Sequence, residues 1–259
     1  MERRDYRPHR HHQVQPFKMT DDQNYEVVNA EAQSEDFEFE ALKEAVNYRR
    51  SLIEEFSPYL EGDILEVGAG IGQFTVELLL VPNVRSVHAI EPDPRFYSKL
   101  LAQNLKIQAT LGTVADLDPS LKCDAIVSVN VLEHIKNHAD ELNRYHACMK
   151  KGGRLCLFVP ACPSIHAPID ANFGHYRRYT RGELRDLLQG AGFRIVKLVY
   201  FNSLGFFAWW FNFCVLKKTS FEVGKVRLYD RRIFPLVHAL ESRCLRPPIG
   251  QSLLAICEA

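Results

Sequence analysis

The sequence lacks an excess of either charge, because 32 Lys and Arg residues are matched by 32 Asp and Glu residues. Nucleic-acid-binding domains usually carry a basic excess, so this balance argues against a nucleic-acid partner and leaves only a local basic patch open. The chain also lacks an apolar run long enough to span a bilayer, and its N-terminus has no apolar core of a secretory signal. These absences predict a soluble protein of the cytoplasm.

No two cysteines form a CxxC pair, and no spacing of cysteine and histidine resembles a zinc site. The chain contains seven cysteines: Cys123, Cys148, Cys156, Cys162, Cys214, Cys244 and Cys257. An odd and scattered set favours free or buried thiols in a reducing compartment. We therefore expect no metal ion and no disulfide framework.

The first 24 residues are polar and lack hydrophobic periodicity, which predicts a disordered arm. A cluster of histidines (His9, His11 and His12) lies in this arm, and a solvated tail is favoured over a metal site there. Residues 25–259 are then expected to form one domain.

Helix-length and strand-length segments alternate along the rest of the chain. Apolar residues recur at helical spacing from Phe39 to Phe56. Strands are then predicted over Ile64–Val67, Ser86–Ile90, Ile107–Leu111, Ala125–Val129 and Arg154–Val159, with helices over Phe74–Leu80, Pro94–Asn104 and Ala139–Lys150. This rhythm predicts an α/β fold with a parallel sheet between two layers of helices.

The second half of the chain departs from this rhythm. An irregular stretch is expected from Pro160 to Tyr179, followed by a short helix that the capping-box spacing of Thr180 and Glu183 predicts. Two more strands are predicted over Phe193–Tyr200 and Ser252–Ile256. An insertion of roughly fifty residues (201–248) separates them, far longer than the usual connections in such sheets.

The sharpest motif is the run Leu65-Glu-Val-Gly-Ala-Gly-Ile-Gly72, at a predicted turn from strand to helix. Its glycines can adopt positive φ and let the backbone approach a ligand closely. Gln73 occupies the position where a dinucleotide-binding loop has its third glycine, and no Lys-Ser/Thr pair follows as in a P-loop. Glu66 would repel a pyrophosphate, but it suits a ligand that carries an ammonium and a sulfonium, as S-adenosylmethionine (SAM) does.

Glu91 ends the second predicted strand, about twenty residues past the glycine loop, where folds of this type place an acid that binds ribose. Its carboxylate could accept hydrogen bonds from two vicinal hydroxyls. Taken alone, Glu91 could equally be an ordinary surface acid. Together with the glycine loop, the ribose role is favoured.

The run Ile64–Thr75 resembles the first motif of class I SAM-dependent methyltransferases. Asn130–Ile135 looks like the turn after that family's fourth strand, and Lys151–Gly153 looks like the turn before its fifth. The resemblance covers roughly residues 40–200. It implies a Rossmann-like seven-stranded sheet whose last strand, here Ser252–Ile256, runs antiparallel.

The resemblance also implies SAM as cofactor and a set of residues that bind it. Asp116 would lie near the adenine amine, where the run Val114–Leu117 could act through a side chain or the backbone. The expected cofactor-binding residues are Glu66, Gly68, Ala69, Gly70, Gly72, Glu91, Asp116 and Asn130.

The segment Asp170–Thr180 gathers a histidine, two tyrosines and two arginines. Its Gly174-His-Tyr-Arg-Arg-Tyr179 run resembles a subgroup of class I methyltransferases associated with glycan or lipid-linked glycan pathways. Because it follows the fifth strand, at the ligand-bearing edge of the sheet, we expect it to bind and orient the methyl acceptor. The alternative is a loop whose Arg and Tyr side chains bridge helix ends and backbone carbonyls.

Methyl transfer from a sulfonium is an in-line displacement in which the enzyme mainly aligns the nucleophile and the methyl group. A base helps if the acceptor is a hydroxyl. His134 and His175 are the candidate bases, and each could instead be a packed or capping histidine. Arg177 or Arg178 could bind an anionic acceptor.

The insertion contains an uncharged segment, Leu204–Leu216, with six Phe and Trp residues. It is too short to span a membrane. Three interpretations stay open: a buried core helix, a lid over an apolar acceptor, or a peripheral membrane contact. A second helix is predicted over Tyr229–Arg243, with Pro235 in its first turns.

Together these features predict a SAM-dependent methyltransferase that acts on oxygen of a small-molecule or glycan-like acceptor. One alternative is a SAM-binding scaffold without turnover. The other is an NAD-dependent oxidoreductase, which Glu66 and Gln73 disfavour. The oligomeric state is not predictable from the sequence.

Overall fold

The computed structural model describes residues 43–243 and 247–259. The predicted arm 1–24, the first residues of the helix predicted from Phe39, and Cys244 lie outside the described residues. Between 43 and 243 and from 247 onward, the six cysteines are free thiols. In these same ranges no helix combines the length and the apolar character that crossing a bilayer requires.

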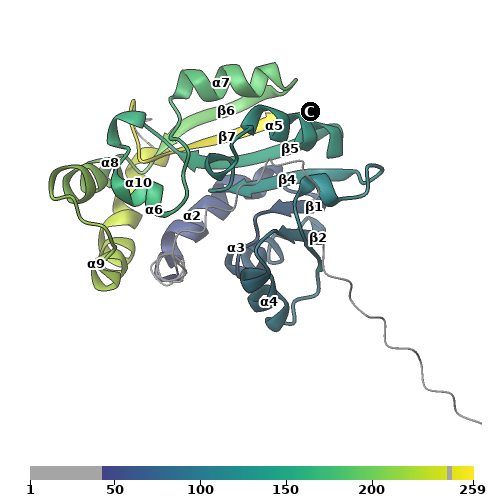
Figure 1. The fold of residues 1–259 in the computed structure, drawn as a ribbon, viewed down its shortest axis with the longest axis horizontal. Helices are drawn as coiled ribbons and strands as arrows, with labels where there is room; N and C mark the ends of the chain where they lie inside the picture. The colour runs from purple at the N-terminus through teal and green to yellow at the C-terminus, as the bar shows by residue number, and fades with distance from the viewer. Residues whose placement is uncertain (1–42, 244–246) are drawn as a thin grey trace, which may run out of the picture.

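A seven-stranded sheet runs through the centre of the molecule in the order β3-β2-β1-β4-β5-β7-β6 (Figure 1). The strands are β1 Gly62–Val67, β2 Val84–Glu91, β3 Gln108–Leu111, β4 Cys123–Val129, β5 Met149–Pro160, β6 Arg194–Phe201 and β7 Ser252–Glu258. The first five pair in parallel, whereas β7 runs antiparallel to both β5 and β6. The predicted α/β class and the antiparallel last strand are confirmed.

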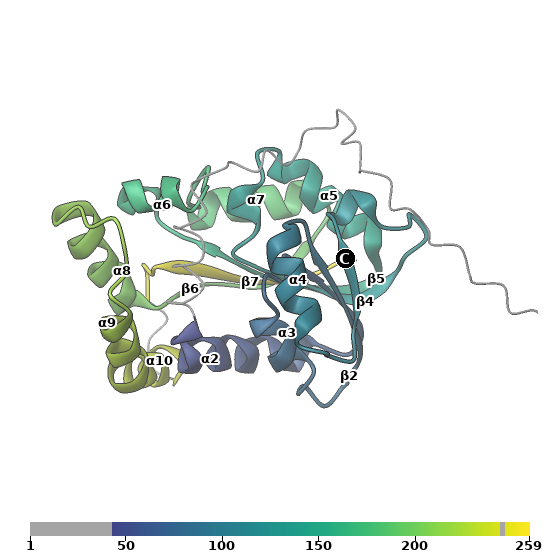
Figure 2. The ribbon, with the colours of Figure 1, turned by 60° about the horizontal axis from the view of Figure 1, so that its bottom comes forward.

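Helices cover both faces of this sheet. They are α2 Val46–Phe56, α3 Gln73–Leu78, α4 Pro94–Ala102, α5 His138–Cys148, α6 Pro168–Asn172, α7 Arg181–Gly190, α8 Ser203–Trp209, α9 Val223–Leu228 and α10 Phe234–Arg243. Figure 2 shows α2 and α3 on one face and α5 and α7 on the other. Because both faces are covered, central strands are apolar along their length, and β7 is buried from Ser252 to Cys257.

The stretch that the sequence predicted as irregular contains two short helices, η4 (Pro163–Ile165) and α6. Each begins with a proline in its first turn, where no backbone N–H is needed. They are too short to show helical periodicity, so the prediction was wrong there. The capping box that starts α7 is confirmed, because Thr180 Oγ1 accepts from the Glu183 amide at 3.1 Å and the Glu183 carboxylate accepts from the Thr180 amide at 2.9 Å.

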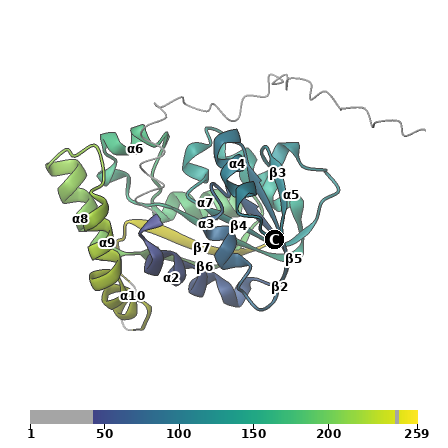
Figure 3. The same ribbon diagram turned by 90° about the horizontal axis from the view of Figure 1, so that it is seen from below.

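The insertion between β6 and β7 forms helices that gather at one end of the sheet (Figure 3). Helix α8 continues into a π-helical turn, η5 (Trp210–Val215), and α9 continues through a second one, η6 (Tyr229–Ile233), into α10. The helix predicted from Tyr229 therefore starts too late, because the helical run begins at Val223. Pro235 is the second residue of α10, just past the η6 turn, and such π-helical turns and prolines are common points of helix irregularity.

The strand order indicates at which edge of the sheet a ligand is expected to bind. From β1 the chain proceeds outward through β2 and β3, and it then returns to β4 on the other side of β1. The order of the strands thus reverses between β1 and β4. In open α/β sheets, ligands bind outside the carboxyl ends of the strands at such a point.

Candidate functional site

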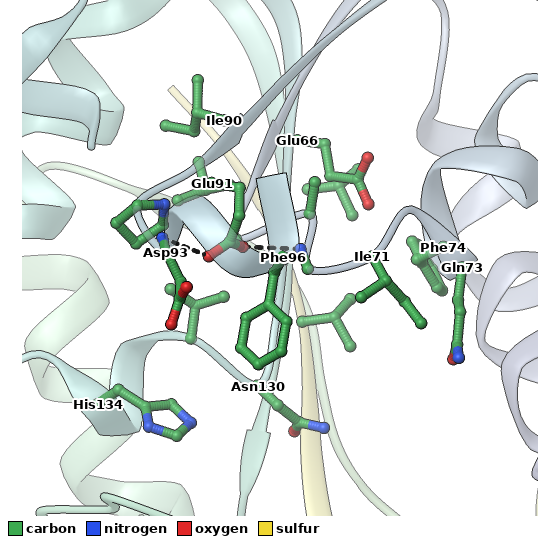
Figure 4. A pocket seen from close by; sticks show the side chains of 18 of the residues that line it. Glu66, Ile71, Gln73, Phe74, Ile90, Glu91, Asp93, Phe96, Asn130 and His134 are labelled. Atoms are coloured by element: carbon green, nitrogen blue, oxygen red, sulfur yellow. Dashed lines mark hydrogen bonds between the residues drawn. The ribbon is translucent and has the colours of Figure 1, made fainter. Parts of the chain in front are cut away.

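A cavity of about 330 Å³ lies at the carboxyl ends of the central strands (Figure 4). It extends from Gly112 and Thr113 after β3, past Glu91 at the end of β2 and over the glycine loop, to Asn130 and His134 after β4. The cavity therefore occupies the switch point that the strand order defines.

The glycine loop adopts the backbone conformation that its sequence predicts. Gly68, Gly70 and Gly72 have φ values of 72°, 55° and 86°, in the left-handed region that favours glycine. A Cβ at Gly68 would lie 2.4 Å from Val131 Cγ2, so this glycine lets β1 meet the turn after β4. Gly72 caps α3, which starts at Gln73.

Glu91 is buried and anchors the glycine loop. Its Oε2 accepts from the Gly70 amide at 2.7 Å, and its Oε1 accepts from the Asp93 amide at 2.9 Å. Figure 4 shows the carboxylate between these two amides, at the cavity wall. The residue predicted to bind ribose thus lines the cavity and also positions the loop.

Glu66 ends up almost fully buried on β1, with 3% of its surface exposed. Its Oε2 has no hydrogen-bond partner in the part of the chain that the structure describes. Burial, together with the nearby charge of Glu91, raises the pKa of Glu66 to about 8. A buried carboxylate without a fixed cation fits a ligand that brings a positive charge.

Asp116 does not line this cavity. It belongs to the short helix η2 (Val114–Asp116), and its Oδ2 accepts from Thr113 N and Thr113 Oγ1, both at 2.8 Å. The helix turns the carboxylate back onto its own N-terminus, so Gly112 and Thr113 border the cavity where the sequence predicted Asp116. Asn130 does line it, with φ of 52° directly after β4.

A second cavity, of about 440 Å³, adjoins the first and shares Ala45, Tyr48, Asn130 and Phe173 with it. It lies under the helical insertion, and we call it the insertion cavity. Its insertion side is rich in apolar residues: Trp209, Phe213, Phe221, Val226, Leu228 and Ile233. The sequence did not identify Tyr48 or Phe173, because periodicity shows only that a residue is apolar and not which cavity it borders.

Asp170 forms the centre of a buried network in the segment 170–180. Its Oδ1 lies 3.0 Å from His175 Nδ1 and accepts from Arg178 at 2.8 and 2.9 Å, while its Oδ2 accepts from the Ala167 amide at 2.9 Å. The Arg178 guanidinium also lies 4.3 Å over the Trp209 ring. Arg178 lines the insertion cavity, but Asp170 pairs with its charge, so an anionic acceptor would compete with this carboxylate; the acceptor role of Arg178 stays a prediction.

Arg177 and Tyr179 fasten the same segment to the turn after β4. Arg177 donates to the carbonyls of Ile135 and Lys136, both at 2.9 Å, and the Tyr179 hydroxyl donates to the Leu132 carbonyl at 3.2 Å. For these two side chains the bridging alternative describes the structure better than acceptor binding does.

The two candidate bases meet at the boundary of the two cavities. His134 lines the first cavity and His175 the insertion cavity, and their rings pack edge to face with centroids 4.7 Å apart. Burial and the neighbouring imidazole lower the pKa of His134 to about 3. Burial also lowers the pKa of His175, against the opposing effect of Asp170. Both imidazoles are therefore neutral near pH 7.

Comparison with known proteins shows the family to which this domain belongs. Residues 40–198 match a family model described as a methyltransferase domain. A curated relative from Mycolicibacterium smegmatis, named "Probable S-adenosylmethionine-dependent methyltransferase", is 26% identical over 138 residues. The match spans 51% of this chain and 52% of that relative, so it covers about half the length of each.

Solved structures share the fold at low sequence identity. A chain of a Haloferax volcanii complex that contains the Trm112 methyltransferase activator has a TM-score of 0.58 at 14% identity, over 89% of this chain and 95% of that chain. A SAM-dependent methyltransferase from Archaeoglobus fulgidus has a TM-score of 0.55 at 16% identity, over 83% and 93% of the two chains. Another, from Mesorhizobium loti, has a TM-score of 0.54 at 15% identity, over 78% and 93%.

Proposed function

The chain belongs to the methyltransferase domain family and has the fold of class I SAM-dependent methyltransferases, and we propose that the protein methylates an oxygen atom of a glycan-like or lipid-linked acceptor. The single observation that supports SAM as the cofactor is the buried carboxylate of Glu66 beside the glycine loop. SAM supplies a methyl group on a positively charged sulfur, together with an ammonium that such a carboxylate suits.

The proposed cofactor site assigns one part of SAM to each part of the first cavity. Glu66 binds the ammonium, Glu91 accepts from the ribose hydroxyls, and Gly112 and Thr113 border the adenine. The remaining lining residues after β4, Asn130 among them, lie on the side toward the insertion cavity, which shares Asn130. This arrangement supports a reacting centre near the turn after β4.

The acceptor is proposed to enter through the insertion cavity. Its apolar lining suits a lipid-like portion, whereas neutral His134 and His175 stand at the boundary as proton acceptors. As the acceptor oxygen bonds to the methyl carbon, the carbon–sulfur bond breaks and its electron pair stays on sulfur. The hydroxyl proton passes to one of the imidazoles.

We further propose that the insertion touches a lipid surface. Trp209 and Phe213 are buried, which fits the core and lid interpretations for those two residues. The opposite stripe of α8 and η5 is exposed, with Phe207 at 54% and Phe211 at 51%. The same insertion exposes three basic residues, Lys217 shortly after η5 and Arg231 and Arg232 in η6. Apolar side chains with flanking cations are typical of a helix that lies in an anionic lipid interface.

Two measurements test the proposed activity. Calorimetric titration with SAM and with NAD should show binding of SAM alone, which separates a methyltransferase from the oxidoreductase alternative. The full chain is then incubated with methyl-labelled SAM and either a lipid-linked glycan fraction or a water-soluble metabolite fraction. We expect label in the lipid-linked fraction and a methoxy signal in the NMR spectrum of the product.

Other outcomes would reject specific parts of the proposal. SAM binding without release of S-adenosylhomocysteine on either fraction would favour the scaffold alternative. Label only in the water-soluble fraction would contradict a lipid-linked acceptor, and a methylamine signal would contradict transfer to oxygen.

A further inference from the structure

Three side chains of types that bind metal ions in proteins come together from the segment after β4 and the segment after α6. Glu133 and His134 belong to the short helix η3 (Leu132–His134), and His175 follows the end of α6. One ligand atom from each residue lies within 4.8 Å of the other two. His175 Nε2 in particular lies 3.9 Å from Glu133 Oε1.

Asp170 orients the His175 ring toward this cluster. Asp170 accepts from the Arg178 guanidinium and from the Ala167 amide, and a carboxylate paired with a guanidinium in this way is ionised and can only accept. His175 Nδ1, 3.0 Å from Asp170 Oδ1, must then carry the proton. The lone pair is left on Nε2, the nitrogen near Glu133. A carboxylate that holds the far nitrogen of a histidine is the usual support of a metal-binding imidazole.

The charges of the cluster also suit a cation. Arg178 balances the charge of Asp170 through contacts at 2.8 and 2.9 Å. Glu133 is 0% exposed and adds a further carboxylate beside His134 and His175. Each imidazole has a ring nitrogen whose lone pair can bind a cation. Buried carboxylates are commonly stabilised by a cation or by a metal ion.

We propose that Glu133, His134 and His175 bind one divalent transition-metal ion. Two imidazole nitrogens and one carboxylate oxygen suit Zn²⁺, Co²⁺ or Fe²⁺, whereas Mg²⁺ and Ca²⁺ prefer oxygen ligands alone. The sequence predicted no metal because Cys and His spacing reveals only ligands that lie close together along the chain. The third ligand comes from a distant segment that only the fold brings close.

The position of the cluster indicates a role for the ion. His134 lines the cofactor cavity and His175 lines the insertion cavity, so the ion stands where the two meet. With the ion bound, His134 and His175 serve as its ligands and do not act as the base. The ion would lower the pKa of an acceptor hydroxyl that binds it, and the proton would pass to water in place of an imidazole. This role rests on the proposed function, whereas the ion site itself does not.

The test uses Co²⁺ as a spectroscopic probe and the full chain with His9, His11 and His12 replaced by alanine, which removes the N-terminal histidines as competing ligands. We expect one Co²⁺ per chain and visible absorption bands of a low-coordinate site. Glu133→Gln and His175→Asn should each weaken the affinity at least about tenfold, and Asp170→Asn about 10- to 100-fold through its hold on His175. His146→Ala removes an imidazole outside the cluster and should leave the affinity unchanged.

Circular dichroism and the SAM affinity of each variant show whether the fold is kept. A chain that binds no Co²⁺, or that binds it with equal affinity after Glu133→Gln and His175→Asn, overturns the proposal. Cobalt bands that depend on the cluster in a protein without methyl transfer support the ion site and contradict the proposed acceptor. The ion site and the proposed methyl transfer can therefore be rejected independently of each other.

Discussion

We expect Glu66 to make cofactor binding depend on pH. Burial and Glu91 hold its pKa at about 8, above the ordinary value of 4.5. For a raised pKa, the contribution to stability is present below pH 4.5 and is lost as the pH rises through 8. Below pH 8 the protein without ligand carries a proton on Glu66, and a cationic ligand must displace this proton to gain the charge.

The affinity for SAM is therefore expected to fall by about tenfold for each pH unit below the pKa of Glu66, because one proton is released on binding. Glu66→Gln should bind SAM more weakly at pH 8 and lose most of this slope. Calorimetry between mildly acidic pH and pH 8 measures both effects. Glu54→Gln, which changes an exposed glutamate of α2, serves as the matched control. An identical slope in Glu66→Gln would place the titrating group elsewhere.

Glu91 anchors the glycine loop and is proposed to bind the ribose, and one experiment can separate these two roles. Glu91→Ala should weaken SAM binding by about 1–3 kcal/mol, the usual cost of losing hydrogen bonds to a charged group. Part of that loss belongs to the Gly70 amide, which Glu91 also holds. The 2′-deoxy analogue of SAM isolates the ribose contact, because Glu91→Ala should weaken binding of the analogue less than it weakens binding of SAM. An analogue that loses as much affinity as SAM does on this substitution would remove the ribose role.

At the scale of elements, the glycine loop depends on backbone conformations that other residues rarely adopt. Gly70 has φ of 55°, and a β-branched side chain there is strained and would project next to the cavity. Gly70→Val should abolish SAM binding in a folded protein, as measured by calorimetry with circular dichroism. Gly182→Ala in α7 is the control, since an added Cβ there meets no atom within 4 Å. Undiminished affinity in a folded Gly70→Val protein would refute the cofactor site.

The exposed face of α8 and η5 is expected to bind a lipid surface. Phe207→Ser and Phe211→Ser should each reduce binding to anionic vesicles by about tenfold or more, because burying a Phe side chain contributes about 1.5–3 kcal/mol. Sedimentation with vesicles measures the binding. Leu80→Ser, at a residue 73% exposed after α3, is the matched apolar control. Equal losses in all three variants, or no loss in any, would contradict a specific lipid-binding face.

At the scale of the whole molecule, the insertion is fastened to the start of the domain through Asp230. This buried residue of η6 accepts from the backbone amides of Asn47 at 3.0 Å and Tyr48 at 2.9 Å, at the N-terminus of α2. The contact joins two segments of distant sequence that both border the insertion cavity. The insertion cavity therefore depends on long-range packing.

Asp230→Asn should lower the free energy of unfolding by about 1–3 kcal/mol, because an amide replaces a charged acceptor of two helix amides. Urea denaturation followed by circular dichroism measures the change. Asp186→Asn, at an exposed side chain of α7, should stay within about 0.5 kcal/mol of wild type. A stability equal to wild type in Asp230→Asn would show that the insertion is held by apolar packing alone.

The sequence alone was sufficient for the sheet, the glycine loop and the placement of Glu66 and Glu91. Each of these features depends on residues close together in the chain: an apolar run that makes a strand, glycines that permit positive φ, and an acid at a strand end. The antiparallel last strand was also predicted, from resemblance to a family. The carboxyl ends of parallel strands meet at one edge, so local patterns were enough to predict that the glycine loop, Glu66 and Glu91 lie together there.

Only the tertiary structure decided which charged side chains stay available. Arg178 pairs with Asp170 and packs over Trp209 of the insertion, whereas Asp116 accepts from Thr113 at the start of η2. It also brought His175 to His134 across a chain separation that no spacing rule covers. The segment Leu204–Leu216 is apolar all round, so no periodicity could show that Trp209 faces inward and Phe207 outward. That choice depends on which neighbouring elements pack against the helix.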